Sequence, residues 1–85
     1  SALGTDAQAT TFAATAIGAL SLATGERATA VGAGAEAIGE RGTAVGQNSS
    51  ADGERSTALG DNAFASSGFS TALGASAFAA NNATT

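Results

Sequence analysis

The chain has 85 residues and a formal net charge of −4, and it contains no histidine, cysteine, proline, methionine, tryptophan or tyrosine. Without imidazole or thiol groups it has no disulfide framework, no zinc site built on cysteine or histidine, and no histidine base, so most enzymatic chemistries are excluded. Its only cations are three arginines, and no apolar run is long enough to span a bilayer, so we expect neither nucleic-acid binding nor direct membrane contact.

Taken in chain order, a tetrapeptide made of a small residue, alanine, an aliphatic residue and glycine recurs at a constant interval. Its copies occupy residues 1–4, 15–18, 29–32, 43–46, 57–60 and 71–74. Alanine also occupies every seventh position from residue 2 to residue 79. The underlying unit is therefore a heptad, small-x-Ala-x-Gly plus two linking residues, as residues 21–27 and 35–41 show. A short fixed period of this kind is typical of a solenoid.

The heptad predicts β-structure rather than a coiled coil. Nine glycines fall on the same repeat position, and each would cost a helix roughly 1 kcal/mol relative to alanine. A coiled coil also needs two large apolar residues per heptad. In an extended segment, the first, third and fifth residues share one face, and here all three are small. We therefore expect five extended residues and a two-residue turn in each heptad, with glycine supplying the backbone angles of the turn.

Two heptads, which make one full period of the tetrapeptide, close one flattened coil with two short strands. Coils stacked about 4.8 Å apart pair these strands into two parallel sheets. The expected fold is all-β, a parallel β-roll (β-solenoid) of six coils that rises about 29 Å at that spacing. The inward positions hold alanine, serine, glycine or occasionally threonine, so we expect a thin roll whose own core is too small to stabilise a lone chain.

The two outer faces of the expected roll differ. The half-coils that contain the tetrapeptide present one aliphatic residue each, namely Leu3, Ile17, Val31, Val45, Leu59 and Leu73. The equivalent column of the other half-coils is mixed, namely Thr10, Thr24, Ile38, Asp52, Ser66 and Ala80. An unbroken aliphatic stripe usually marks an interface, and burying each of its side chains contributes about 1.5–3 kcal/mol. We interpret the stripe as a self-association surface.

A Glu-Arg pair occupies the same turn in three successive coils. Its residues are Glu26, Arg27, Glu40, Arg41, Glu54 and Arg55. Like charges stack in this arrangement, which is unfavourable unless each glutamate meets an arginine. We interpret these residues as ion pairs between chains around an oligomer axis. The alternative is a solvated turn with weak ion pairs.

The tandem heptads, such as residues 28–32 and 56–60, resemble the head repeats of YadA-like trimeric autotransporter adhesins over essentially the whole chain. The resemblance implies a left-handed roll and a homotrimer with the aliphatic stripe at the threefold axis. The left hand comes from the resemblance alone, because parallel crossovers usually prefer the right hand. We expect residues 1–85 to be a single head fragment of about six repeats, truncated at both ends.

The resemblance also implies display on the surface of a Gram-negative bacterium, with an outer-membrane anchor in a C-terminal domain absent from this chain. Heads of this family are typically adhesive and contribute to virulence, so the expected partner is a host extracellular-matrix protein or a host cell-surface receptor. The candidate ligand surface comprises Phe64 and Phe78, one coil apart on the outer face, and Phe69 in the intervening turn. The alternative is that these rings pack against each other or against a neighbouring subunit.

Functions other than adhesion also fit parts of the pattern. A rigid spacer that displays another binding domain fits the repetition equally well. Threonine columns beside the stripe also resemble those of ice-binding solenoids, a function that requires the stripe to face water. We expect no catalytic residue, metal or cofactor, because the carboxylates are dispersed and no nucleophile–base pair can be assembled.

Overall fold

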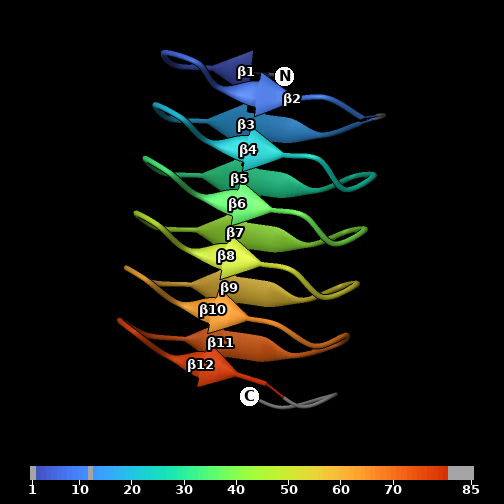
Figure 1. Ribbon diagram of the computed structural model, residues 1–85, viewed down its shortest axis with the longest axis vertical. Helices are drawn as coiled ribbons and strands as arrows, with labels where there is room; N and C mark the ends of the chain where they lie inside the picture. The colour runs from blue at the N-terminus through green and yellow to red at the C-terminus, as the bar shows by residue number, and fades with distance from the viewer. Residues whose placement is uncertain (1, 12, 81–85) are drawn as a thin grey trace.

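A computed structural model describes residues 2–11 and 13–80, which form twelve short strands (Figure 1). The strands alternate between two six-stranded sheets. The odd-numbered sheet comprises β1 (Ala2–Leu3), β3 (Thr15–Ile17), β5 (Thr29–Val31), β7 (Thr43–Val45), β9 (Thr57–Leu59) and β11 (Thr71–Leu73). The even-numbered sheet comprises β2 (Gln8–Ala9), β4 (Leu22–Ala23), β6 (Glu36–Ala37), β8 (Ser50–Ala51), β10 (Phe64–Ala65) and β12 (Phe78–Ala79).

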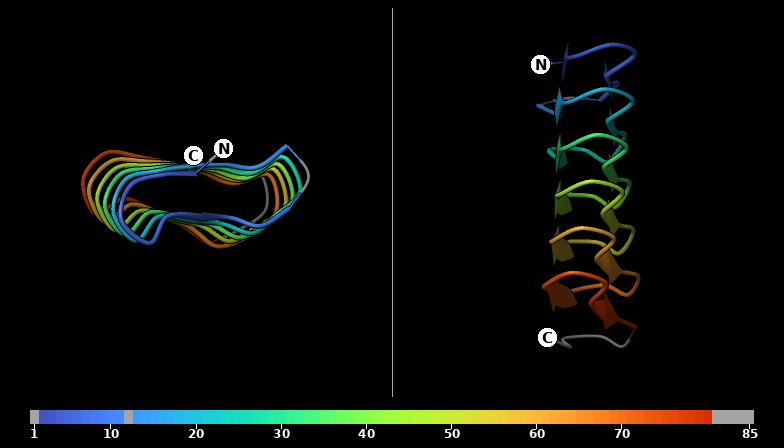
Figure 2. Two further views of the ribbon diagram at one scale, coloured as in Figure 1. Left: turned by 90° about the horizontal axis from the view of Figure 1, so that it is seen from above. Right: turned by 90° about the vertical axis from the view of Figure 1, so that its left-hand side faces the viewer.

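Every strand pairs in parallel with the equivalent strand of the next coil, so equivalent residues of successive coils stand side by side. Val31 pairs with Val45 in the odd-numbered sheet, and Ala37 pairs with Ala51 in the even-numbered sheet. Seen from the N-terminal end, the chain turns anticlockwise as it recedes, so the coil is left-handed (Figure 2). The predicted left-handed parallel β-solenoid of 14-residue coils is therefore confirmed, while the trimeric state stays a prediction.

The interior of the roll contains only small side chains. The molecule measures 31 × 24 × 10 Å, and its longest axis is close to the rise expected for six coils. Fourteen alanines form the core cluster, and the largest fully buried side chains are those of Ser21, Ser49, Ser56 and Ser70. Along β7, Ala44 is buried whereas Thr43 and Val45 are half-buried, as strand alternation predicts. The core of small side chains expected from the sequence is thus present.

The turns that follow the odd-numbered strands use glycine as predicted. Gly32 and its equivalents in the other coils have φ between 115° and 132°, a backbone conformation that a β-carbon opposes. The residue two positions later, Gly34, adopts φ 71°, and the turn closes with a hydrogen bond from the amide of Ala35 to the carbonyl of Gly32.

The turns that follow the even-numbered strands use glycine for a different reason, which corrects the prediction. Gly39 does not have a positive φ, but a β-carbon there would lie 2.1 Å from the carbonyl oxygen of Gly53 in the next coil. The left-handed residue in this turn is Arg41, with φ 60°. Its amide donates to the carbonyl of Glu26 at 2.8 Å, so the ladder between coils holds this conformation. Close backbone approach, and not turn angle, selects glycine on this edge.

Two coils carry a hydroxyl residue in place of that closely packed glycine, and the sixth carries Asn81, which lies outside the described residues. Thr11 donates from its Oγ1 to the carbonyl of Gly25 at 2.7 Å, and Ser67 donates from its Oγ to the carbonyl of Ala80. Each of these side chains therefore forms a hydrogen bond to the next coil, whereas a glycine at this position contacts the next coil through its backbone alone.

Candidate interaction surfaces

The outer face of the odd-numbered sheet presents one aliphatic side chain per strand. The predicted stripe residues Leu3, Ile17, Val31, Val45, Leu59 and Leu73 are paired in register from β1 to β11. Leu3 is 63% exposed and Leu73 is 54% exposed at the ends, while Val31 and Val45 in the middle are half-buried against their neighbours. The structure therefore brings all six residues together as one continuous apolar surface, which we call the aliphatic stripe.

The Glu-Arg turns lie together on one edge of the roll, the edge reached after each even-numbered strand (Figure 1). Their backbones are linked from coil to coil, since the amide of Arg55 donates to the carbonyl of Glu40 at 2.7 Å. All six side chains are exposed. Among the described residues, none of these glutamates forms an ion pair with an arginine of the same chain. The six charged groups are stacked in one column of turns, and their carboxylates remain available to another partner.

The three candidate phenylalanines fall into two separate groups. Phe64 and Phe78 stack on the outer face of the even-numbered sheet, with ring centroids 5.1 Å apart and ring planes 5° from parallel. Phe69 lies in the Glu-Arg turn column, where the guanidinium of Arg55 sits 5.6 Å from its ring centroid. The rings of Phe64 and Phe78 thus contact each other, as one of the two interpretations expected. No contact in the described chain joins Phe69 to that pair.

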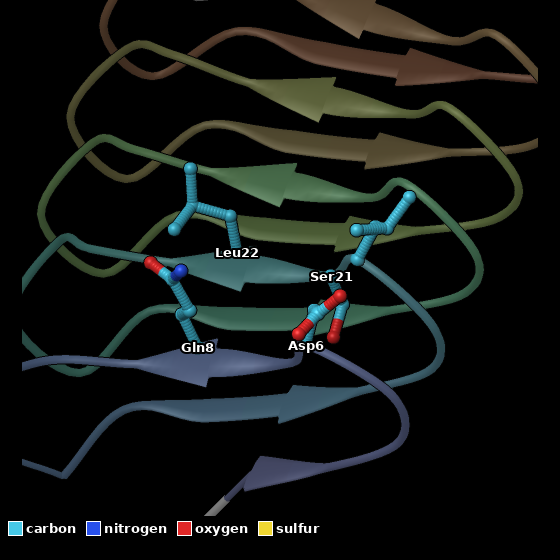
Figure 3. A pocket seen from close by; sticks show the side chains of 5 residues that line it. Asp6, Gln8, Ser21 and Leu22 are labelled. Carbon is cyan, nitrogen blue, oxygen red and sulfur yellow. The ribbon is translucent and has the colours of Figure 1, made fainter.

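A hollow near the N-terminal end of the roll is a feature that sequence reasoning missed. It has a volume of about 310 Å³ and is lined by Asp6, Gln8, Leu20, Ser21 and Leu22. Gln8 and Leu22 project from the neighbouring strands β2 and β4, and Asp6 stands where the preceding turn enters β2 (Figure 3). We call this the N-terminal hollow. Leu20 is the signal that was available, because the equivalent turn positions hold aspartate, glycine, asparagine and serine.

The described residues show neither a metal centre nor a membrane span. No three side chains among aspartate, glutamate, histidine and cysteine gather there in a way that could hold a metal ion. The same residues contain no helix long and apolar enough to cross a membrane.

Comparison with protein families agrees with this architecture. The family model described as the YadA head domain repeat, which spans two copies of the repeat, matches residues 12–35, 37–63 and 53–77, well over half of the chain. The chain belongs to the YadA head family. YadA heads are structural, adhesin-type parts of trimeric autotransporters and not enzymes, and their parent proteins are displayed at the cell surface from an outer-membrane anchor. No curated protein matches the chain at a significant level.

Proposed function

We propose that this YadA head is a homotrimeric adhesin head that attaches a Gram-negative bacterium to host extracellular matrix or to host cells. The observation that supports it most directly is the aliphatic stripe, an unbroken apolar column on one face of a roll whose family consists of trimeric adhesins. The remaining surface, on the even-numbered sheet and the edge opposite the Glu-Arg turns, is then free for a ligand.

The trimer is favoured because the interior of each roll buries only small side chains, whereas one outer face exposes a continuous aliphatic stripe. Among residues 2–11 and 13–80, no fully buried side chain is larger than serine, so the roll gains little from its own core. The six stripe side chains each contribute about 1.5–3 kcal/mol when removed from water. Three rolls that turn their stripes to a common axis bury all of them at once. This arrangement also removes the stripe from water, which is incompatible with ice binding.

The Glu-Arg turns add a second contact between subunits. The carboxylate of Glu40 has no arginine partner in its own chain, and Arg41 stands beside it in the same turn. In a threefold arrangement, an edge of one roll meets its neighbour, so glutamates of one subunit pair with arginines of the next. Such exposed pairs contribute about 0.2–1 kcal/mol each, so they select the register between subunits more than they stabilise the trimer.

The trimer is tested by the molecular mass in solution of the wild type and of Val45→Asp. We expect three chains in the wild type and dissociation in the variant, because a buried carboxylate in an apolar interface has no partner. Ser66→Asp is the matched control, since it lies in the column of the even-numbered sheet where Asp52 is already tolerated. A monomeric wild type, or a Val45→Asp protein that stays trimeric and stable, contradicts the proposal.

Adhesion is tested by binding of the trimer to immobilised collagen, fibronectin and laminin and to epithelial cells. We expect binding to at least one of these surfaces, with Phe64, Phe69 and Phe78 as the candidate ligand surface. The second candidate function, a rigid spacer, is favoured by the uniform stacking of coils over the 31 Å length of the roll. A spacer binds none of the surfaces, so the same panel separates the two functions.

A further inference from the structure

Leu20 is an exposed leucine in a backbone conformation that leucine disfavours. Its φ is 63° and its side chain is 65% exposed. The left-handed region costs an L-residue with a large side chain roughly 1–2 kcal/mol, and glycine, asparagine or aspartate avoids most of that cost. The same turn position in the flanking coils holds Asp6 and Gly34. Every turn of the described chain places one residue in this conformation, so the backbone angle belongs to the fold, and the feature particular to Leu20 is a large aliphatic side chain left in solvent without gaining core packing.

The surroundings of Leu20 form a concave site. The amide of Leu20 donates to the carbonyl of Thr5 at 2.8 Å, which holds this turn directly against the turn that carries Asp6. Leu22 follows on β4, opposite Gln8 of β2. The N-terminal hollow is thus walled by two leucines on one side, and by a carboxylate and an amide on the other. Gly34 takes the equivalent turn position one coil further on and contributes no side chain to the hollow.

The charge around the hollow is negative. Asp6 is exposed and forms no ion pair within the described chain. Glu36 pairs in register with Leu22 on the adjacent strand and is also exposed. All three arginines lie in the turns of the opposite edge (Figure 1). An anionic partner is therefore repelled here, and a purely apolar one leaves the carboxylate of Asp6 without a partner.

We propose that the N-terminal hollow binds the side chain of a lysine or arginine in an extended segment of a protein partner. Such a side chain has an aliphatic stem that lies along Leu20 and Leu22 and a cationic head that reaches the carboxylate of Asp6. Glu36, on the strand beyond Leu22, adds a second negative charge to the same face. The inference deepens the proposed adhesive function, because it names the chemistry of the ligand at one site of the head.

The first experiment uses three capped pentapeptides, each with two glycines on either side of a central residue. The central residue is lysine, norleucine, which keeps the stem without the charge, or diaminopropionate, which keeps the charge on a short stem. We expect the lysine peptide to shift the amide NMR signals of Asp6, Gln8, Leu20 and Leu22 in the native oligomer in a saturable manner. We expect the other two peptides to bind about tenfold more weakly or less. Equal binding of all three peptides, or shifts spread over the whole surface, overturns the proposal.

The second experiment uses variants that separate binding from stability. Leu20→Gly removes the apolar wall and also relieves the left-handed backbone, so we expect an unchanged or higher unfolding midpoint together with at least about a fivefold loss of lysine-peptide affinity. Asp6→Asn is expected to weaken binding and to reduce its dependence on salt, with Glu36 still contributing a negative charge. Asp61→Asn is the matched control, since it removes an exposed carboxylate from another turn of the same edge. If Leu20→Gly lowers the oligomer's mass or stability, Leu20 is a subunit contact and the proposal is wrong.

Matrix binding by the same variants distinguishes this inference from the adhesive function. If the wild type binds a matrix protein and Leu20→Gly binds it equally well, the hollow is not the site although the head is adhesive. If the wild type binds no matrix protein or cell but binds the lysine peptide at the hollow, the adhesive function fails and the site stands.

Discussion

Replacing Gly39 by alanine tests whether close approach of the coils, and not turn geometry, requires glycine on the Glu-Arg edge. A β-carbon at Gly39 would lie 2.1 Å from the carbonyl oxygen and 2.4 Å from the carbonyl carbon of Gly53. Both distances are far shorter than the 3.4 Å at which ordinary van der Waals contact begins. Both atoms belong to the backbone of the next coil, so no side-chain rotation can relieve the overlap. The two coils must separate locally.

That separation opens hydrogen bonds between the coils. The amides of Ile38 and Gly39 both donate to the carbonyl of Ala51, at 3.0 and 3.2 Å. Each lost bond costs about 1 kcal/mol net, and overpacking adds about 1–3 kcal/mol. We expect a total loss of about 3 kcal/mol or more, a large part of the 5–15 kcal/mol typical of a domain. Thr11 and Ser67 carry a β-carbon at the equivalent place in two other coils, where the hydroxyl of each donates a hydrogen bond to a carbonyl of the next coil, a compensation that alanine cannot supply.

Urea unfolding followed by far-ultraviolet circular dichroism measures this loss. Gly34→Ala is the matched control, because φ there is 71° and the nearest atom to an added β-carbon is the flexible Oδ1 of Asn48. Ala13 already adopts φ 59° in an equivalent turn of the other edge, so we expect the control to lose only about 1 kcal/mol. Equal losses in the two variants, or no loss in Gly39→Ala, would refute the reasoning.

The remaining predictions concern a buried hydroxyl, the charged edge and the aromatic pair. Ser56 Oγ is buried with no hydrogen-bond partner, whereas Ser70 Oγ donates to the carbonyl of Ser67 at 2.6 Å. In thermal unfolding, Ser56→Ala should therefore gain about 1 kcal/mol and Ser70→Ala should lose about as much, and a loss in both would contradict the assignment. Arg41→Glu should weaken the trimer at low salt, and adding Glu40→Arg to the same chain should restore it, as measured by sedimentation. If neither variant changes the oligomer mass, the proposal of inter-chain ion pairs is wrong. Phe64→Ser combined with Phe78→Ser should leave the trimer intact and reduce matrix binding, and undiminished binding removes the pair from the ligand surface.

The sequence predicts the architecture of this chain because alanine is fixed at one inward position of every heptad. Only a side chain as small as that of Ala44 or Ala51 fits between two sheets in a slab 10 Å thick, so the seven-residue alanine period directly reports the length of a half-coil. The alternation of Thr43, Ala44 and Val45 then assigns each residue to a face. These two observations are enough to place the aliphatic stripe on one sheet.

The hand of the coil, the turns and the hollow were not predictable in the same way. Both hands satisfy the heptad pattern, so the left hand came only from the resemblance. The left-handed conformation of Arg41 is imposed by the hydrogen bond to the preceding coil and not by its own preference. Phe69 meets Arg55 because they share one turn column, which a search for rings on one face overlooks. In the sequence, Leu20 could be noticed only because the equivalent turn positions of the other coils hold small or polar residues.

The two sheets differ in how much their outward residues vary, and this difference indicates where a ligand can bind. The backbone ladder and the small interior are the same in every coil, so exposed positions vary without disturbing the fold. On the odd-numbered sheet, the outward stripe positions keep one chemical type, since every stripe residue is aliphatic. On the even-numbered sheet the outward column passes through glutamine, leucine, glutamate, serine and phenylalanine. If the stripe lies at the threefold axis, this variable sheet and the edge opposite the Glu-Arg turns are the surface that meets a partner. Both the N-terminal hollow and the stacked Phe64 and Phe78 lie there, near opposite ends of the roll, so an extended partner would contact both at once.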